Sequence, residues 1–212
     1  ASAGAAGITV KMLASTRLIR CYVAAASRIS MALARFVTMR DGGLKQAARF
    51  GKLPWLSLSV LVFVLDQLSK LYFEGTLTLY QQIVLIPDYF SWTLAYNTGA
   101  AFSFLADADG WQRWFFAAIA LVVSAVLVVW LKRLKADETW LALALALVLG
   151  GALGNLFDRV AYGHVIDFIL VHWQNRWYFP AFNLADSAIT VGAILLALDM
   201  FKSQKSEESA HD

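Results

Sequence analysis

The stretch WLALALALVLGGALGNLFDR, residues 140–159, is a long apolar run that ends in polar residues. No charged side chain occurs between Trp140 and Leu156. A helix needs about 20 apolar residues to cross about 30 Å of hydrocarbon, so this stretch predicts a membrane-spanning helix. Its glycines, Gly150, Gly151 and Gly154, are spaced so that the backbone of another helix can approach closely.

Three further segments are long and apolar enough to cross a membrane. They are approximately Leu53–Tyr72, Trp111–Leu131 and Phe182–Phe201. The chain as a whole is 59% hydrophobic and only 16% charged, which is the balance of a membrane protein. The sequence therefore predicts a membrane α-helical fold with four transmembrane helices.

Lysine and arginine in the short flanking segments predict the orientation of these helices. The basic residues are Arg35, Arg40, Lys45, Arg49 and Lys52 before the first span, Lys132, Arg133 and Lys135 between the second and third, and Lys202 and Lys205 after the fourth. By the positive-inside rule these three regions are cytoplasmic, which places both termini in the cytoplasm. The two remaining connections, 73–109 and 159–181, then face outward.

The chain divides by composition into three parts. Residues 1–50 form a basic extension rich in Ala, Ser and Arg, which we expect to be mobile; residues 51–202 form the membrane domain; residues 203–212 form a polar tail. Within the outward segment 73–109, β-branched and aromatic residues recur around Leu77–Ile86 and Phe90–Phe104 between turn signals. This pattern predicts a small sheet on the membrane surface.

The single cysteine, Cys21, excludes an internal disulfide and a Cys-based metal cluster. The basic runs lack regularly spaced aromatics for base stacking, so no nucleic-acid partner is expected. We expect no metal and no other cofactor.

Polar residues gather toward the outward ends of the predicted spans. They are Asp66, Lys70, Asn97, Asn155, Asp158, Arg159, Asp167, Asn183 and Asp186. An ionisable group at membrane depth costs a few kcal/mol or more, and it usually marks a site of proton, ion or substrate handling. Asp167 and Asp186 stand out, because two carboxyls in one site cannot both ionise freely, so that one serves as acid while the other serves as base. This is the chemistry of an aspartic protease.

Simpler roles remain open for several of these residues. Asp66 and Lys70 are four residues apart and can neutralise each other on one helix. Asp158 and Arg159 can form an interfacial pair at a helix end. Asn183 can cap the fourth helix, with Asp186 in its first turn, which is compatible with catalysis.

Other classes of function also remain open. His164 and His172 flank Asp167 and form an alternative metal-ligand set, although the sequence has no HExxH helix. No G-x-S-x-G motif supports serine catalysis. A small transporter or proton-conducting protein would also place Asp, Lys and Asn along a membrane pathway. A further alternative is a membrane subunit with a purely structural role.

Five motifs between Leu53 and Lys202 resemble the lipoprotein signal peptidases, or signal peptidase II, of bacteria. They are Asp66-Gln67-Leu68-Ser69-Lys70, Tyr96-Asn97-Thr98-Gly99-Ala100-Ala101-Phe102-Ser103, Gly150-Gly151-Ala152-Leu153-Gly154-Asn155-Leu156-Phe157-Asp158-Arg159, Val165-Ile166-Asp167-Phe168 and Phe182-Asn183-Leu184-Ala185-Asp186-Ser187. Their order across the predicted topology makes the resemblance specific.

The resemblance implies a four-helix aspartic endopeptidase of the bacterial inner membrane with an extracytoplasmic β-cradle. Its substrates would be prolipoproteins, cut just before a diacylglyceryl-modified cysteine, and the active site would face the periplasm. The family's catalytic pair corresponds to Asp167 and Asp186. Its supporting polar residues correspond to Asp66, Lys70, Asn97, Asn155, Asp158, Arg159 and Asn183. We expect the protein to contact membrane lipid and to act as a monomer.

Overall fold

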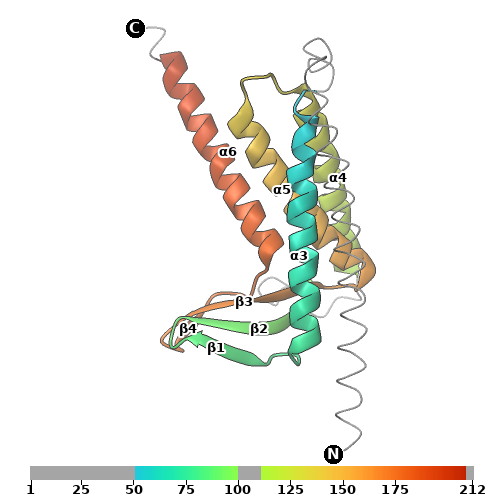
Figure 1. The fold of residues 1–212 in the computed structure, drawn as a ribbon, viewed down its shortest axis with the longest axis vertical. Helices are drawn as coiled ribbons and strands as arrows, with labels where there is room; N and C mark the ends of the chain where they lie inside the picture. Colours follow the sequence, from blue (N-terminus) through green and yellow to red (C-terminus); the bar gives the residue numbers. More distant parts are fainter. Residues whose placement is uncertain (1–50, 100–110, 209–212) are drawn as a thin grey trace, which may run out of the picture.

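The computed structural model describes residues 51–99 and 111–208 of the chain (Figure 1). The elements are, in order, the 3-10 helix η2 (Leu53–Trp55), α3 (Leu56–Thr76), β1 (Gln82–Ile86), β2 (Phe90–Asn97), α4 (Trp111–Arg133), α5 (Thr139–Ala161), β3 (Val165–Trp173), β4 (Trp177–Tyr178) and α6 (Leu184–Glu208). The predicted extension 1–50 and the end of the segment predicted to form strands, from residue 100 on, lie outside the described residues.

Within the residues that the structure describes, four helices are long and apolar enough to span a membrane, as predicted. Their spanning segments are Leu53–Thr76, Trp111–Arg133, Thr139–Ala161 and Leu184–Phe201. The third helix was predicted to end near Leu156 and the outward loop to begin at Arg159, and both boundaries were wrong. The helix continues to Ala161 because the charged group of Asp158 has buried partners and does not have to reach water. The fourth helix continues to Glu208, into the predicted polar tail.

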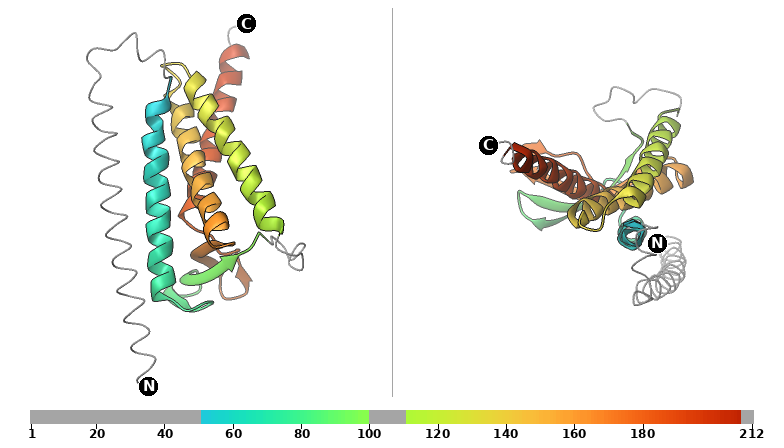
Figure 2. Two further views of the ribbon diagram at one scale, coloured as in Figure 1. Left: turned by 90° about the vertical axis from the view of Figure 1, so that its right-hand side faces the viewer. Right: turned by 90° about the horizontal axis from the view of Figure 1, so that it is seen from above.

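Helix α5 lies at the centre of the bundle and packs against α3, α4 and α6 (Figures 1 and 2). Its glycines permit this, as their spacing predicted. A Cβ on Gly150 would lie 2.7 Å from the backbone oxygen of Ser59 in α3, and one on Gly151 would collide with the backbone oxygen of Ala185 in α6. The small side chains therefore bring the backbones of three helices together at one level.

The four strands form one antiparallel sheet in the order β1-β2-β3-β4, at one end of the helices (Figure 1). The first two strands lie within the segments predicted to be extended, but they begin at Gln82 and end at Asn97. The central strand β3 was missed, because segment 159–181 was predicted to be a surface loop. Most of Val165–Trp173 is buried, so the strand lacks the apolar–polar alternation that identifies a half-exposed strand.

An aromatic contact joins the sheet to the helices. Phe73, in the last turns of α3, stacks on Phe168 of β3 with ring centroids 4.4 Å apart. Leu77, Leu94 and Ile166 form a buried cluster beside this contact. Since Phe168 follows Asp167 directly, this packing holds the central strand, and Asp167 with it, against the C-terminal end of α3.

Candidate active site

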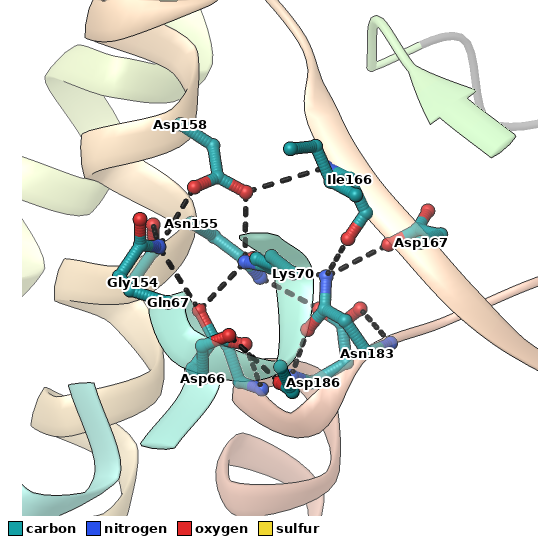
Figure 3. A network of polar contacts seen from close by, with 12 residues as sticks. Asp66, Gln67, Lys70, Gly154, Asn155, Asp158, Ile166, Asp167, Asn183 and Asp186 are labelled. Carbon is teal, nitrogen blue, oxygen red and sulfur yellow. Dashed lines mark hydrogen bonds and ion pairs between the residues drawn. The ribbon is translucent and has the colours of Figure 1, made fainter. Parts of the chain in front are cut away.

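Asp167 and Asp186 come from different elements and meet where the sheet joins the helices (Figure 3). Asp167 lies in β3 opposite Ala95 of β2, and only 2% of its surface is exposed. Asp186 lies in the first turn of α6 and is partly buried. The 18 residues between them run along β3, turn back through β4 and enter α6, so strand pairing brings the two carboxyl groups to one place.

Asn183 contacts both aspartates. Its side-chain Nδ2 donates a 2.7 Å hydrogen bond to Oδ1 of Asp167, and its Oδ1 accepts one of 2.9 Å from the backbone N–H of Asp186. The backbone N–H of Asn183 donates in turn to Oδ2 of Asp186 at 3.2 Å. This reciprocal arrangement is a capping box, so Asn183 caps α6 as predicted and joins the two carboxyl groups at the same time.

Asn155 of α5 contacts Asp186 directly and Asp167 through Asn183. Its Nδ2 donates to Oδ1 of Asp186 at 2.7 Å, and its Oδ1 accepts from Nδ2 of Asn183 at 3.2 Å. The same Oδ1 accepts from Nζ of Lys70 at 3.0 Å. Two asparagines and a lysine thus form a continuous hydrogen-bonded path from α3 to both aspartates.

Lys70 is held by two buried carboxylates. Its Nζ lies 2.7 Å from Oδ2 of Asp66 and 2.7 Å from Oδ2 of Asp158, and all three side chains are essentially inaccessible. The predicted pairing of Asp66 with Lys70 is therefore present, but it is one half of a larger network. A buried charge that is paired and hydrogen-bonded in this way is tolerated at membrane depth, whereas an unpaired one is not.

The same two carboxylates hold the backbone next to each candidate catalytic residue. Oδ1 of Asp66 accepts a 2.8 Å hydrogen bond from the backbone N–H of Ala185, the residue before Asp186. Oδ2 of Asp158 accepts one of 3.3 Å from the backbone N–H of Ile166, the residue before Asp167. The ion network therefore anchors both chain segments from which the aspartates project.

Gln67 completes the network and was not predicted as a site residue. Its Nε2 donates to Oδ1 of Asp158 at 2.8 Å and lies within hydrogen-bonding distance of Oδ2 of Asp66 and the backbone oxygen of Gly154. The available signal was its position beside Asp66 inside a polar motif on an otherwise apolar helix. A buried amide that meets two carboxylates stabilises their charged forms.

Arg159 and Asn97 border the site. The guanidinium of Arg159 donates to the backbone oxygen of Asn155 at 3.2 Å and lies over the ring of Phe116. No ion pair joins Arg159 to Asp158 among the described residues, so the interfacial pair considered from the sequence is replaced by Asp158–Lys70. Asn97 of β2 hydrogen-bonds through its side chain to the carboxyl group of Asp167.

Burial raises the pKa of Asp167 from its usual value of 3.8 to about 7, and the nearby charge of Asp186 adds to this effect. The hydrogen bonds from Asn97 and Asn183 and the charge of Lys70 act in the opposite direction but do not overcome it. Near neutral pH, Asp167 can therefore hold a proton or release it, which is the range in which a carboxyl group serves as general acid or base.

The structure does not assemble the His–Asp–His ligand set considered from the sequence. The ring of His164 packs at a tilt against that of Tyr96, whereas His172 hydrogen-bonds to Ser91 and stacks against Tyr178. Within residues 51–99 and 111–208 there is no group of three or more His, Cys, Asp or Glu side chains suited to a metal ion.

Comparison with known proteins identifies the family of this chain. The family model described as signal peptidase (SPase) II matches residues 58–202. A lipoprotein signal peptidase of Pseudomonas fluorescens is 80% identical over 166 residues, which cover 78% of this chain and 98% of the relative. One of Pseudomonas aeruginosa is 77% identical over 168 residues, which cover 79% of this chain and 99% of the relative.

A solved structure, described as a bacterial membrane enzyme determined by the in meso method at 2.3 Å resolution, is 31% identical in sequence. It superposes with a TM-score of 0.61 over 72% of this chain and 90% of its own. The matched residues 58–202 cover the sheet and most of the four helices, and they include Asp167 and Asp186 together with Asn155 and Asn183. The chain belongs to the signal peptidase II family.

Proposed function

We propose that this protein is an aspartic endopeptidase that removes signal peptides from prolipoproteins, cutting immediately before the diacylglyceryl-modified cysteine. Membership of the signal peptidase II family makes it a protease. The names of its Pseudomonas relatives supply the substrate class. Asp167 and Asp186 are the proposed catalytic pair, acting on a water molecule held between them.

The observation that carries this proposal is the double contact of Asn183. One side chain donates to Asp167 and caps the helix turn that presents Asp186, so the two carboxyl groups form a single hydrogen-bonded unit (Figure 3). Two like charges in one site cannot both form freely, and a pair that shares one proton is what peptide hydrolysis by carboxyl groups requires.

In the proposed reaction, the ionised carboxylate takes a proton from water while the water oxygen bonds to the scissile carbonyl carbon. The protonated carboxyl group donates to the carbonyl oxygen, and a tetrahedral intermediate forms. Its collapse breaks the carbon–nitrogen bond and delivers a proton to the leaving amine. Asn155, Asn183 and Asn97 orient the pair through hydrogen bonds, and no covalent intermediate is needed.

The proposed setting is the bacterial inner membrane with the site toward the periplasm. The basic segment 132–135 joins α4 to α5 at the end of the bundle away from the sheet. The positive-inside rule makes that end cytoplasmic and the sheet extracytoplasmic. A lipid-modified substrate would then reach the site laterally, with its acyl chains still in the bilayer, and a monomer suffices because both aspartates come from one chain.

The deciding experiment is cleavage of a diacylglyceryl-modified prolipoprotein by the purified protein in detergent. Asp167→Asn and Asp186→Asn each keep the size of the side chain and remove its charge, so we expect folded variants without cleavage. The matched control is Asp199→Asn, on the same helix as Asp186 but toward its other end, which should cleave normally. Full activity in either of the first two variants would show that Asp167 and Asp186 are not a catalytic dyad. If a metal chelator inhibited the wild-type protein, metal catalysis would be favoured instead.

A further inference from the structure

The orientation of the Asn155 amide is imposed by Lys70. A lysine ammonium has three hydrogen-bond donors and no acceptor, so only the carbonyl oxygen of an amide can face it. Nζ of Lys70 lies 3.0 Å from Oδ1 of Asn155, which turns the amide N–H group of Asn155 away from the lysine. That N–H group donates to Oδ1 of Asp186 at 2.7 Å (Figure 3).

The orientation of Asn183 is set independently, by helix α6. Its Oδ1 accepts the backbone N–H of Asp186 as the helix cap, so its Nδ2 must point out of the helix. That nitrogen donates to Oδ1 of Asn155 at 3.2 Å and to Oδ1 of Asp167 at 2.7 Å. Asn183 therefore donates an amide N–H group to Asp167 and Asn155 donates one to Asp186, and neither amide can be reversed without losing a buried hydrogen bond.

Asp186 lies in surroundings that favour negative charge. Both of its oxygens accept N–H groups, Oδ1 from Asn155 and Oδ2 from the backbone of Asn183. It lies in the first turn of α6, where the helix dipole stabilises an anion. Arg159 interacts electrostatically with it. Hydrogen bonds donated to both oxygens stabilise a carboxylate, because a protonated oxygen could no longer accept them well.

Asp167 lies in surroundings that favour the neutral acid. It projects from a strand, so no helix terminus stabilises its charge, and it is 2% exposed. Burial raises its pKa to about 7, with the charge of Asp186 as a further cause. The charged groups that face the pair are Lys70 and Asp66 on α3 and Asp158 and Arg159 on α5, while β2 contributes the uncharged Asn97.

We propose that Asp186 is the resting carboxylate that takes the proton from water, that Asp167 holds the proton at rest, and that Lys70 is a positioning residue which imposes this order through Asn155. The inference rests on the proposed function, since it assigns the two roles within the proposed pair. If Asn155 were reversed, its carbonyl oxygen would face Asp186 and would require a proton there instead.

The proton balance follows from this assignment. Asp186 accepts a proton from water as the new carbon–oxygen bond forms, and Asp167 gives its proton to the carbonyl oxygen. When the carbon–nitrogen bond breaks, Asp186 gives its proton to the leaving nitrogen and Asp167 takes back the proton of the intermediate's hydroxyl group. One water is consumed, and the pair returns to its starting state.

The first test is infrared spectroscopy of the full-length protein in detergent without substrate, recorded as a function of pH. The wild type should show a protonated carboxylic acid band that disappears as pH rises through about 7. Asp167→Asn should lack this band. Asp186→Asn should keep it, with its disappearance moved to lower pH because the like charge is gone. A band retained in Asp167→Asn and absent from Asp186→Asn would reverse the assignment.

Cleavage assays on the same two variants keep the two proposals apart. If both variants cleave the prolipoprotein, the proposed function fails whatever the spectra show. If both are inactive and the band belongs to Asp186, the dyad stands and only the assignment of roles fails.

The second test addresses Lys70 and Asn155 through the pH profile of kcat/KM. Asn155→Leu leaves the Lys70 ion pairs intact but removes one N–H donor from Asp186, so kcat/KM should fall by a larger factor at acid pH than at neutral pH. Lys70→Arg keeps a donor-only cation, so its acid limb should stay at the wild-type position even if kcat falls. Loss of activity in Asn155→Leu by the same factor at every pH would show a purely structural role and overturn the proposal.

Discussion

The backbone N–H of Ala185 donates a 2.8 Å hydrogen bond to Oδ1 of Asp66, a residue 119 positions earlier in the chain. Asp158 makes the corresponding bond to Ile166 at 3.3 Å. Two aspartates that take no part in the proposed chemistry therefore hold the backbone immediately before the two that do. Lys70, which pairs with both, ties these anchors into one unit.

Removing the Asp66 anchor should destabilise the protein and disturb catalysis together. Asp66→Ala leaves the Ala185 N–H without its partner and Lys70 with one carboxylate in place of two. Breaking a buried ion pair by removing one partner costs about 3–5 kcal/mol. The measurement is thermal unfolding in detergent alongside cleavage. Asp137→Asn, at an exposed carboxylate between α4 and α5, is the control, and equal stability of Asp66→Ala and Asp137→Asn would contradict the anchoring role.

Substitutions of Asn183 should separate helix capping from catalysis. Asn183→Ser keeps a good N-cap residue but has no amide N–H for Asp167, so the cap should be retained while the lost buried hydrogen bond costs about 1–3 kcal/mol. Activity should fall roughly 100-fold, the scale seen when a supporting hydrogen bond is lost. Asn183→Ala removes both functions and should also lose about 1 kcal/mol of stability. Wild-type cleavage by Asn183→Ser would show that Asn183 acts only as a cap.

A methyl group at Gly154 should displace Asp66. A Cβ there would lie 2.5 Å from Oδ2 of Asp66, which cannot move freely because Ala185 and Lys70 bind the same carboxylate. Overpacking of this kind costs about 1–3 kcal/mol, so Gly154→Ala should lower the unfolding temperature and reduce kcat. Val160→Ala, at an exposed position of the same helix, is the control. A fully stable and active Gly154→Ala protein would contradict the tight packing.

Stability should depend on pH through Asp167, because its pKa is raised from 3.8 to about 7 on folding. A raised pKa means that the folded state binds the proton more tightly than the unfolded state. Stability is then greatest below about pH 4 and falls as pH rises to about 7, by on the order of 4 kcal/mol for this shift. Asp167→Asn should remove this component and unfold at a higher temperature than the wild type at pH 8. An Asn variant with the wild-type pH dependence would show that another group titrates.

Deleting residues 1–45 should leave cleavage nearly intact. The family model begins at residue 58, and the truncated chain would keep Lys52, whose Nζ donates to the backbone oxygen of Ala136 and to Oγ1 of Thr139. Lys52→Ala in the truncated protein should loosen this contact and lower the unfolding temperature. A correctly inserted but inactive truncation would show that the extension contributes to activity.

Much of the fold was predictable because membrane helices are encoded locally. Each span is a continuous apolar run, and the glycines of α5 mark the faces where other helices approach. The end of α5 and the existence of β3 were not predictable in this way. Asp158 and Asp167 look like boundary or loop residues until their partners, which lie far away in sequence, are known.

The sequence by itself determined the four membrane spans, the membership of the signal peptidase II family and the set of polar residues from which the proposed catalytic pair is drawn. Only the tertiary structure decided which of these polar residues contact one another. Lys70 could be assigned to Asp66 from helix spacing alone, but its second bond to Asp158 and its contact with Asn155 join residues 85 or more positions apart. Hydrogen-bond direction depends on which atoms meet in space, and no local pattern records it.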